Sequence, residues 1–318
     1  MSKKIVKLGV VGLKRGCDVT LTAIGMDGAK LCAACDRNPE VLEKAKKRYE
    51  AKGLYDCTYY TDYEEFLKHD MDVVLLANYA TEHAPFAIKA MKAGKHVMCE
   101  KPMAINSCEA KKMLDAAKRT GKKLTIGYQS RFRQNSMYLK RLCEAGELGE
   151  IYYARAQAVR RRAVPTWGVF LDAENQGGGP LIDIGTHSLD LTLYLMNNYK
   201  PRMVVGTSYK KVEGADQGNP WGGWPADQNT TLEDAAFGFI VMENGATIVL
   251  ESAWALNTLD VREAVTTLCG TLAGADMHNG GIRLNGVRNG RQYVLEPNFK
   301  AGGVAFNDGK KSESAADR

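Results

Sequence analysis

The chain reads Gly9-Val10-Val11-Gly12-Leu13-Lys14-Arg15-Gly16 where its first β-branched apolar run, Ile5 to Val11, ends. A glycine-rich turn between a strand and a helix lets backbone amides approach a pyrophosphate, which the helix N-terminus also attracts. The usual spacing is G-x-G-x-x-G. Counting from Gly12, this chain has Lys14 at the position of the second glycine, and Gly16 stands one position before that of the third. We therefore expect an altered nucleotide-binding turn over Gly12 to Arg15, in which the ammonium of Lys14 can pair with phosphate.

An acidic residue follows the second apolar run, Leu31 to Cys35. This residue, Asp36, stands 24 positions after Gly12, close to the spacing of the acid that binds a ribose 2′-hydroxyl. A carboxylate there repels a 2′-phosphate and favours NAD over NADP, although the neighbouring Arg37 weakens that preference and keeps NADP possible. The alternative is that Asp36 only shapes the turn before the next helix.

The first 127 residues alternate apolar strand-like runs with helix-like segments. Continuous apolar strands separated by helices of about 10–15 residues indicate a parallel sheet covered on both faces. We expect residues 1–127 to form a nucleotide-binding α/β domain. The expected strands are Ile5–Val11, Leu31–Cys35, Val73–Ala77, His96–Cys99 and Lys123–Ile126, and the expected helices are Pro39–Lys52, Thr81–Ala93 and Ser107–Arg119.

The pattern changes in residues 128–318, where longer alternating strands indicate an open, mostly antiparallel sheet with a helix on one face. The segment Gly214–Thr231 should be a long loop, and Asp308–Arg318 is polar and should be disordered. From Ile282 onward no helical period is visible, so we expect a shortened C-terminal region. The expected strands are Ile151–Val159, Met203–Val212, Ala235–Met242, Thr247–Ala255 and Val265–Ala273, with helices at Asn135–Ala145 and Thr186–Asn197.

Composition excludes several classes of protein. The 318 residues are 45% hydrophobic and 25% charged, as in a packed protein of two domains. The net charge of +6 is spread along the chain, and the densest basic run, Arg160–Arg162, is too short to indicate nucleic-acid binding. No apolar run approaches the ~20 residues that span a bilayer, and no signal peptide is visible. We expect a cytoplasmic protein that binds neither nucleic acid nor membrane.

The eight cysteines suggest reduced thiols rather than a metal site. Cys32 and Cys35 have C-x-x-C spacing, but they lie in an apolar strand, where residues three apart point to opposite faces. No second C-x-x-C completes a zinc site. We expect these thiols to be core residues, and we expect no metal.

Three separated residues could move a proton. Lys101 follows an apolar strand, and Pro102 disfavours a helical conformation at the lysine, which holds it at the carboxyl end of the sheet. Asp183 and His187 are four apart, after the glycine run 177–179, and share a face if the helix has begun by Asp183. Histidine can accept a hydroxyl proton near neutral pH, lysine can stabilise charge on the same oxygen, and aspartate can orient either one. Alone, each residue could equally be solvated or packed.

These motifs resemble those of the Gfo/Idh/MocA family, which includes glucose–fructose oxidoreductase and inositol dehydrogenase. The resemblance covers about Ile5 to Asp276, and its most specific part is Glu100-Lys101-Pro102 together with Asp183-Ile184-Gly185-Thr186-His187. It implies a Rossmann domain followed by an α/β domain with a large open sheet. It also implies NAD(P)-linked oxidation of a sugar, cyclitol or glycoside hydroxyl and a homodimer or homotetramer built on that sheet.

The resemblance also implies roles for single residues. Lys101, Asp183 and His187 fall on the family's catalytic positions. The residues that it places at the cofactor are Asn78, His83, Glu100 and Gln129, and those that it places in the substrate cleft are Tyr128, Arg131, Arg161 and Trp167. In addition, Trp221 and Trp224 suit stacking on a sugar ring.

Two other functions fit the same residues. A glycosidase could use bound NAD for transient oxidation and elimination, and would cleave a glycoside with no net NADH. A non-catalytic family member would keep the fold, and the substitution at Lys14 is compatible with it, whereas the complete set Lys101, Asp183 and His187 argues against it.

Overall fold

The computed structural model describes residues 5–23, 25–212, 218–222, 231–278 and 280–299. Most of the expected loop Gly214–Thr231, including Trp224, and the whole tail Asp308–Arg318 lie outside the described residues. The described chain forms two compact units that meet in sequence between Gly127 and Tyr128.

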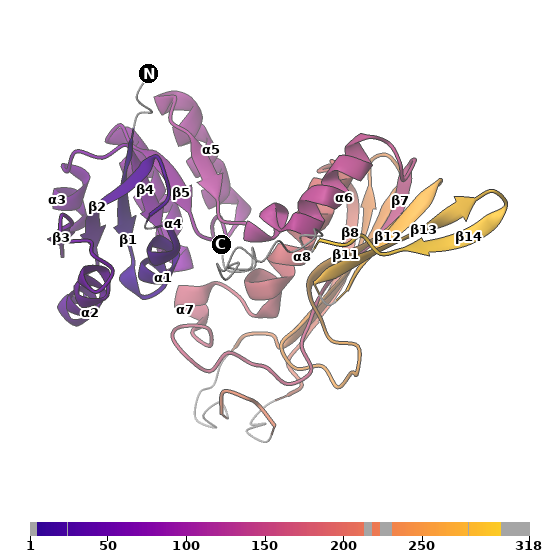
Figure 1. Cartoon of the computed structure of the whole chain (residues 1–318). Coiled ribbons are helices and arrows are strands. Elements are labelled where there is room, and N and C mark those ends of the chain that lie inside the picture. The colour runs from indigo at the N-terminus through magenta and orange to yellow at the C-terminus, as the bar shows by residue number, and fades with distance from the viewer. Residues whose placement is uncertain (1–4, 24, 213–217, 223–230, 279, 300–318) are drawn as a thin grey trace, which may run out of the picture. The chain divides into compact units, whose positions relative to one another are not determined.

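The first unit contains a six-stranded parallel sheet in the order β3-β2-β1-β4-β5-β6 (Figure 1). The order reverses between β1 and β4, and open α/β sheets bind ligands at the carboxyl ends of strands at such a point. The strands are β1 (Val6–Val11), β2 (Ala29–Cys35), β3 (Thr58–Tyr60), β4 (Val73–Leu76), β5 (His96–Cys99) and β6 (Leu124–Ile126). The helices are α1 (Leu13–Ala23), α2 (Pro39–Glu50), α3 (Tyr63–Leu67), α4 (Ala80–Lys92) and α5 (Ser107–Thr120).

Helices cover both faces of this sheet, which confirms the predicted arrangement. On one face, Leu13 of α1 and Tyr49 of α2 pack against Val10 of β1. On the other face, α4 and α5 contribute Ala87 and Met113 to a second apolar cluster. Because both faces are buried, the inner parts of the strands are continuously apolar instead of alternating, as in residues 9–11 of β1 and Val73–Leu76 of β4.

Local signals set several helix ends where the sequence predicts them. The side chain of Asn38 accepts a hydrogen bond from the amide of Glu40 at 2.9 Å, and Asn106 caps α5 through the amide of Glu109 at 2.9 Å. Gly121 ends α5 in the left-handed conformation, with φ of 65°. Caps of this kind contribute about 1 kcal/mol each.

The second unit contains an eight-stranded sheet in the order β14-β13-β12-β11-β7-β10-β9-β8. Only β7 and β10 pair in parallel, so the predicted mostly antiparallel sheet is confirmed. The strands are β7 (Ile151–Val159), β8 (Pro201–Tyr209), β9 (Ala235–Met242), β10 (Thr247–Ala253), β11 (Arg262–Gly270), β12 (Ala273–His278), β13 (Gly281–Arg288) and β14 (Arg291–Leu295). The helical segments are the 3-10 turn η1 (Gln129–Phe132), α6 (Gln134–Glu144), α7 (Ala173–Gln176), the π-helical turn η2 (Leu181–Gly185) and α8 (Thr186–Met196).

One face of this sheet forms the core of the second unit. Leu139 of α6 and Leu191 of α8 pack there against Ala154, Ala156 and Ile248. The small alanines of β7 let the helices approach the central strands closely, because their side chains occupy little space between the two layers.

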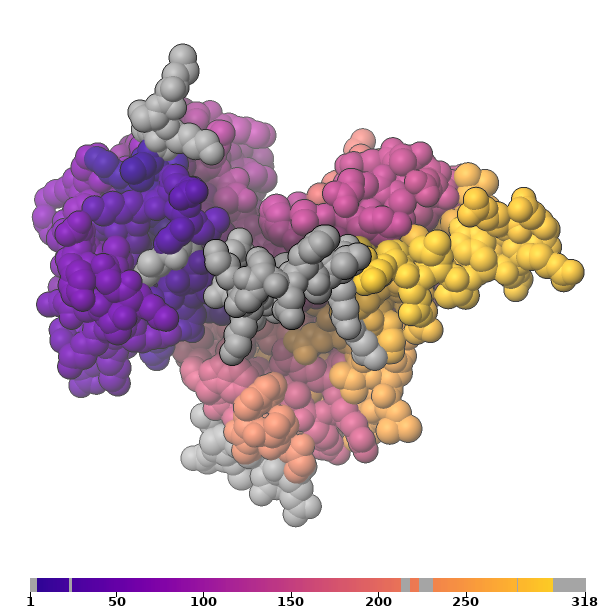
Figure 2. Space-filling model, viewed as in Figure 1, coloured from indigo at the N-terminus to yellow at the C-terminus, as the bar shows by residue number. Residues whose placement is uncertain are grey.

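The C-terminal part of the sheet changes the bounds of one predicted strand and contains a hairpin that was not predicted. The strand expected at Val265–Ala273 is β11, which ends at Gly270, and Ala273 begins the antiparallel strand β12. The stretch from Ile282 onward, where no helical period is visible, contains strands. It forms the hairpin β13–β14, which extends the sheet to the yellow edge in Figure 2. Asn289 and Gly290, with φ of 51° and 74°, make the turn, and Asn-Gly is a strong signal for a two-residue hairpin.

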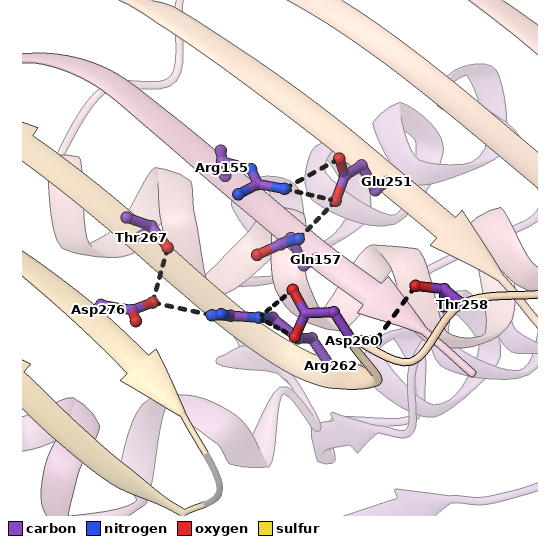
Figure 3. Close-up of polar contacts among 8 residues, drawn as sticks. All are labelled: Arg155, Gln157, Glu251, Thr258, Asp260, Arg262, Thr267 and Asp276. Atoms are coloured by element: carbon purple, nitrogen blue, oxygen red, sulfur yellow. Dashed lines mark hydrogen bonds and ion pairs between the residues drawn. The ribbon is translucent and has the colours of Figure 1, made fainter. Parts of the chain in front are cut away.

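The opposite face of the second sheet carries polar pairs in its centre. Arg155 and Gln157 of β7 both contact the carboxylate of Glu251 on β10, and Arg262 bridges Asp260 and Asp276 (Figure 3). We call this surface the open face. Toward β8 and β9 it becomes apolar, and Val205, Tyr209 and Phe239 are 58%, 41% and 46% exposed.

Candidate active site

The glycine-rich turn connects β1 to α1 at the carboxyl edge of the first sheet. Gly12 has φ of 83°, and a Cβ atom there would lie 2.6 Å from the backbone of Ala77. A Cβ at Gly16 would lie 2.7 Å from Cγ2 of Val10, so Gly16 lets α1 pack closely on the sheet. In the usual fingerprint the third glycine provides that close packing, and here Gly16 provides it one position earlier.

Asp36 lies at the end of β2 beside this turn. Its Oδ2 accepts a hydrogen bond from the amide of Leu13 at 2.8 Å, and its Oδ1 accepts one from the amide of Asn38 at 2.9 Å. A carboxylate has about four acceptor positions, so two remain for ribose hydroxyls. Asp36 therefore shapes the turn and can also bind a sugar, and the two readings of this residue are compatible.

A pocket of about 320 Å³ opens at the carboxyl ends of β1, β2 and β4. Five of the predicted cofactor residues line it, namely Gly12, Lys14, Asp36, Arg37 and Asn78. The sequence reasoning missed Asp62, Tyr63, Tyr79, Glu82 and Phe86, which also line it. The only sequence signal for these residues is their position directly after a strand or in the first turns of the following helix.

The residues of this pocket fit a dinucleotide. The first-turn amides of α1 have no acceptor within their own helix and favour an anion, and Lys14 lies on the same turn. The Oδ1 atom of Asn78 is buried and has no hydrogen-bond partner among the described residues. A polar ligand group in the pocket would satisfy that oxygen.

Lys101 follows β5 in a loop that two other residues organise. Glu100 pairs with Arg15 at 3.5 Å, and its Oε2 accepts a hydrogen bond from the amide of Lys101 at 3.2 Å. His83 is buried on α4, and its Nδ1 lies 2.7 Å from the carbonyl oxygen of Pro102. Because a carbonyl oxygen can only accept, Nδ1 of His83 donates this hydrogen bond, and burial lowers the pKa of the imidazole. Among the predicted cofactor residues, His83 is thus placed to support the lysine loop.

Asp183 and His187 are both buried in the second unit. The carboxylate of Asp183, on η2, accepts a hydrogen bond from Nε1 of Trp254 at 2.9 Å. His187 lies in the first turn of α8, and the ring of Tyr128 meets it edge to face at 6.1 Å. Helical structure has therefore begun before the predicted start at Thr186 and includes Asp183, but as a π-helical turn.

Tyr128 is fixed by neighbours of its own. Its hydroxyl lies 2.8 Å from the hydroxyl of Thr186, and the guanidinium of Arg131 lies 5.9 Å from its ring centroid. Arg131 forms a two-point ion pair with Asp190 of α8 and lies 4.8 Å from the ring of Tyr194. The structure thus gives Arg131, a predicted substrate residue, contacts that hold η1 against α8.

The Arg131–Asp190 pair also affects the proton affinity of the carboxyl. Burial raises the pKa of Asp190, and the hydrogen bond and charge of Arg131 lower it in part. Removing the arginine from a buried ion pair lowers the free energy of unfolding, because the carboxylate then lacks a cation. The pair therefore links the stability of this region to Arg131.

The other predicted residues of the second unit lie at the surface. Gln129 and Arg161 are exposed. Trp167 is 48% exposed, and its ring meets those of Phe170 and Trp221 edge to face at 5.6 and 4.7 Å. These rings form an exposed aromatic group of the kind that can stack on the apolar face of a sugar.

The cysteines do not form a metal site among the described residues. All eight are free thiols, and the part of the chain that the structure describes contains no group of three metal-ligating side chains. Cys35 is buried, which raises the pKa of its thiol to about 12, whereas Cys32 is half-buried. Within the described residues, no helix is both long and apolar enough to cross a membrane.

Two family descriptions match the chain. Residues 6–128 match "Oxidoreductase family, NAD-binding Rossmann fold", and residues 136–274 match "GFO/IDH/MocA C-terminal domain". Together they cover both units.

Individual proteins are similar over most of the same region. D-glucoside 3-dehydrogenase of Escherichia coli is 35% identical over 249 residues, which are 78% of this chain and 69% of that protein. Myo-inositol 2-dehydrogenase of Thermotoga maritima is 29% identical over 60% of this chain, and the chain spans about half of its length, 54%. A solved structure of levoglucosan dehydrogenase with NADH has a TM-score of 0.74 at 20% identity, covering 92% of this chain and 80% of that chain.

Proposed function

Because the chain belongs to the Gfo/Idh/MocA family of oxidoreductases, we propose that it is an NAD-linked dehydrogenase of a sugar, cyclitol or glycoside hydroxyl. The observation that carries this proposal is the pocket in which the Gly12 turn, the start of α1 and the Asp36 carboxylate come together. That combination suits the pyrophosphate and one ribose of a dinucleotide.

The cofactor would be held by groups of the first unit. The amides of Lys14 and Arg15 in the first turn of α1 and the ammonium of Lys14 would bind the phosphates, and the open acceptor positions of Asp36 would bind ribose hydroxyls. Bound nicotinamide accepts or supplies the hydride, which no side chain can do. The carboxylate of Asp36 supports a preference for NAD over NADP, because it would repel a 2′-phosphate.

The proton would be moved by Lys101, Asp183 and His187. We assign His187 as the group that takes the hydroxyl proton, Lys101 as the group that stabilises charge on the same oxygen, and Asp183 as the group that orients the base. The hydrogen bond from Trp254 supports the last role, because it fixes the buried carboxylate of Asp183.

The substrate class is supported by the relatives and by the aromatic surface. The two relatives are named for a glucoside and for an inositol, and both compounds carry several secondary hydroxyls. The exposed rings of Trp167 and Trp221 could stack on such a ring. A glycoside or cyclitol is therefore the first class to test.

We further propose that two copies of the chain associate through the open face. The exposed side chains of Val205, Tyr209 and Phe239 form an apolar patch on it, and large exposed patches mark interaction surfaces. Light scattering should give the mass of a dimer or tetramer, and Phe239→Glu should lower that mass. Leu114→Glu, at an exposed position on α5 of the first unit, should not. A monomeric wild type would contradict this assembly.

The function is tested by two measurements on the wild-type chain. Fluorescence titration should show saturable binding of NAD⁺, and a panel of monosaccharides, inositols and glycosides should contain a compound that reduces it. Binding without reduction by any member would favour the non-catalytic alternative, and absence of dinucleotide binding would overturn the proposal.

A further inference from the structure

The pocket of the first unit contains an arginine whose charge is already compensated. Nη1 of Arg37 lies 3.0 Å from Oε1 of Glu82, and its guanidinium lies 5.1 Å from the ring centroid of Tyr79. Arg37 follows Asp36 directly, where an arginine can accommodate the 2′-phosphate of NADP. Its present partners hold the guanidinium against α4.

The carboxylate of Glu82 is itself fixed from two sides. While Oε1 pairs with Arg37, Oε2 accepts a hydrogen bond from Nδ2 of Asn78 at 3.1 Å. The side chain of Glu82 is 26% exposed and that of Arg37 is 69% exposed. Glu82 is therefore the more buried partner. If Arg37 moved to pair with another anion, the carboxylate of Glu82 would lose its cation.

The charges that line the pocket disfavour a further anion near the ribose. Three lining residues are acidic, Asp36, Asp62 and Glu82, and two are basic, Lys14 and Arg37. The sum is −1, and a 2′-phosphate would add roughly −1.5 to −2 near neutral pH. Without Glu82 the same lining would sum to zero and would leave Arg37 available to pair with phosphate.

We infer that Glu82 is a specificity-determining residue, which excludes NADP by keeping Arg37 paired. The inference rests on the proposed function, because it assumes that the pocket binds a dinucleotide. It gives Asp36 and Glu82 different roles in cofactor preference. Asp36 binds the hydroxyls of NAD, and Glu82 prevents Arg37 from compensating the phosphate of NADP.

The test is the ratio of the dissociation constants for NADP⁺ and NAD⁺, measured by fluorescence titration at constant ionic strength. Glu82→Gln keeps the size of the side chain and removes its charge, and we expect it to lower the ratio at least ~10-fold, or about 1.4 kcal/mol. Glu64→Gln is the matched control, because Glu64, on α3, pairs with Lys89 of α4, the helix that carries Glu82, and does not line the pocket. Its ratio should equal that of the wild type.

A second pair of variants separates charge from structure. In the Glu82→Gln background, Arg37→Ala should remove the gain in NADP⁺ binding, whereas Arg37→Ala alone should not raise the ratio. The gain in NADP⁺ affinity of Glu82→Gln over wild type should also be smaller at high salt, because salt screens charges at a partly exposed site.

The outcomes distinguish this inference from the proposed function. An unchanged ratio in folded Glu82→Gln that still binds NAD⁺ would overturn the role of Glu82 and leave the function intact. A marked loss of NADP⁺ binding in Arg37→Ala alone would overturn it too, because Arg37 would then already bind the phosphate. A wild type that binds neither dinucleotide would overturn the proposed function itself.

Discussion

Nε1 of Trp254 donates a hydrogen bond to Oδ2 of Asp183 at 2.9 Å, and both side chains are buried. The two residues are 71 positions apart in the sequence. Trp254 directly follows β10, whereas Asp183 lies on the π-helical turn before α8. The sheet of the second unit therefore fixes a carboxylate that we place in the proton relay.

Removal of this hydrogen bond should destabilise the protein. Trp254→Phe removes the indole N–H together with the five-membered ring. It leaves a buried carboxylate with one donor fewer and a small cavity, which should cost at least about 1–3 kcal/mol in the free energy of unfolding. Urea unfolding measures this change. Trp167→Phe, at an exposed ring, should change the same quantity by less than about 0.5 kcal/mol. Equal stability of Trp254→Phe and wild type would show that the hydrogen bond contributes nothing.

Loss of either proton-handling residue should slow turnover without removing the cofactor. His187→Ala and Lys101→Ala should each lower kcat at least ~100-fold, because each removes a group that we propose to act on the reacting oxygen. Steady-state kinetics and a parallel titration of NAD⁺ separate the two effects. Turnover like that of the wild type in either variant would remove that residue from the relay.

Cofactor preference should depend on the charge of Asp36. Because its carboxylate also accepts hydrogen bonds from the amides of Leu13 and Asn38, Asp36→Ala combines a loss of charge with a loss of turn structure. Asp36→Asn keeps an acceptor oxygen and should still reduce the preference for NAD⁺ over NADP⁺. Dissociation constants for both cofactors check this expectation, and an unchanged ratio in both variants would exclude Asp36 from the ribose site.

The Arg131–Asp190 pair predicts a pH-dependent stability. Arg131→Met removes the group that lowers the pKa of Asp190, so the pKa of the buried carboxyl should rise further above its unfolded value of about 4. Between the pKa of Asp190 in the unfolded chain and its pKa in the folded variant, the folded variant binds more protons than the unfolded chain. Its free energy of unfolding therefore falls as pH rises through that range. We expect a loss of about 2–3 kcal/mol at pH about 7 that shrinks as pH falls toward about 4.

Unfolding of Arg131→Met at the two pH values, each compared with wild type, measures this trend. Arg131→Met combined with Asp190→Asn is the control, because it has no buried carboxyl and its difference from wild type should vary much less with pH. A deficit of equal size at both pH values would show that the carboxyl stays ionised without its arginine.

Where a feature depends on neighbouring residues in the chain, the sequence predicts it well. The caps at Asn38 and Asn106 and the helix end at Gly121 follow from residue type and position. The parallel sheet follows from uninterrupted apolar strands. Even the missed hairpin β13–β14 had a local signal, since Asn289-Gly290 separates two alternating runs.

Features that depend on distant contacts could not be read from the pattern. Nothing near Glu82 indicates that it meets Arg37, which is 45 residues earlier, or that Trp254 meets Asp183. Arg131 likewise carries no sign in the sequence that it pairs with Asp190, which is 59 residues later. Such pairs form only when the sheet topology brings their elements together.

The most direct test of hydride transfer from a carbohydrate hydroxyl is the appearance of NADH in a mixture of the protein, NAD⁺ and a glycoside or inositol. The wild type should form NADH with at least one member of the panel, in step with formation of the corresponding ketone. His187→Ala should bind NAD⁺ and form NADH at least ~100-fold more slowly. Cleavage of the glycoside with no net NADH, or no reduction with any member despite bound NAD⁺, would contradict the account.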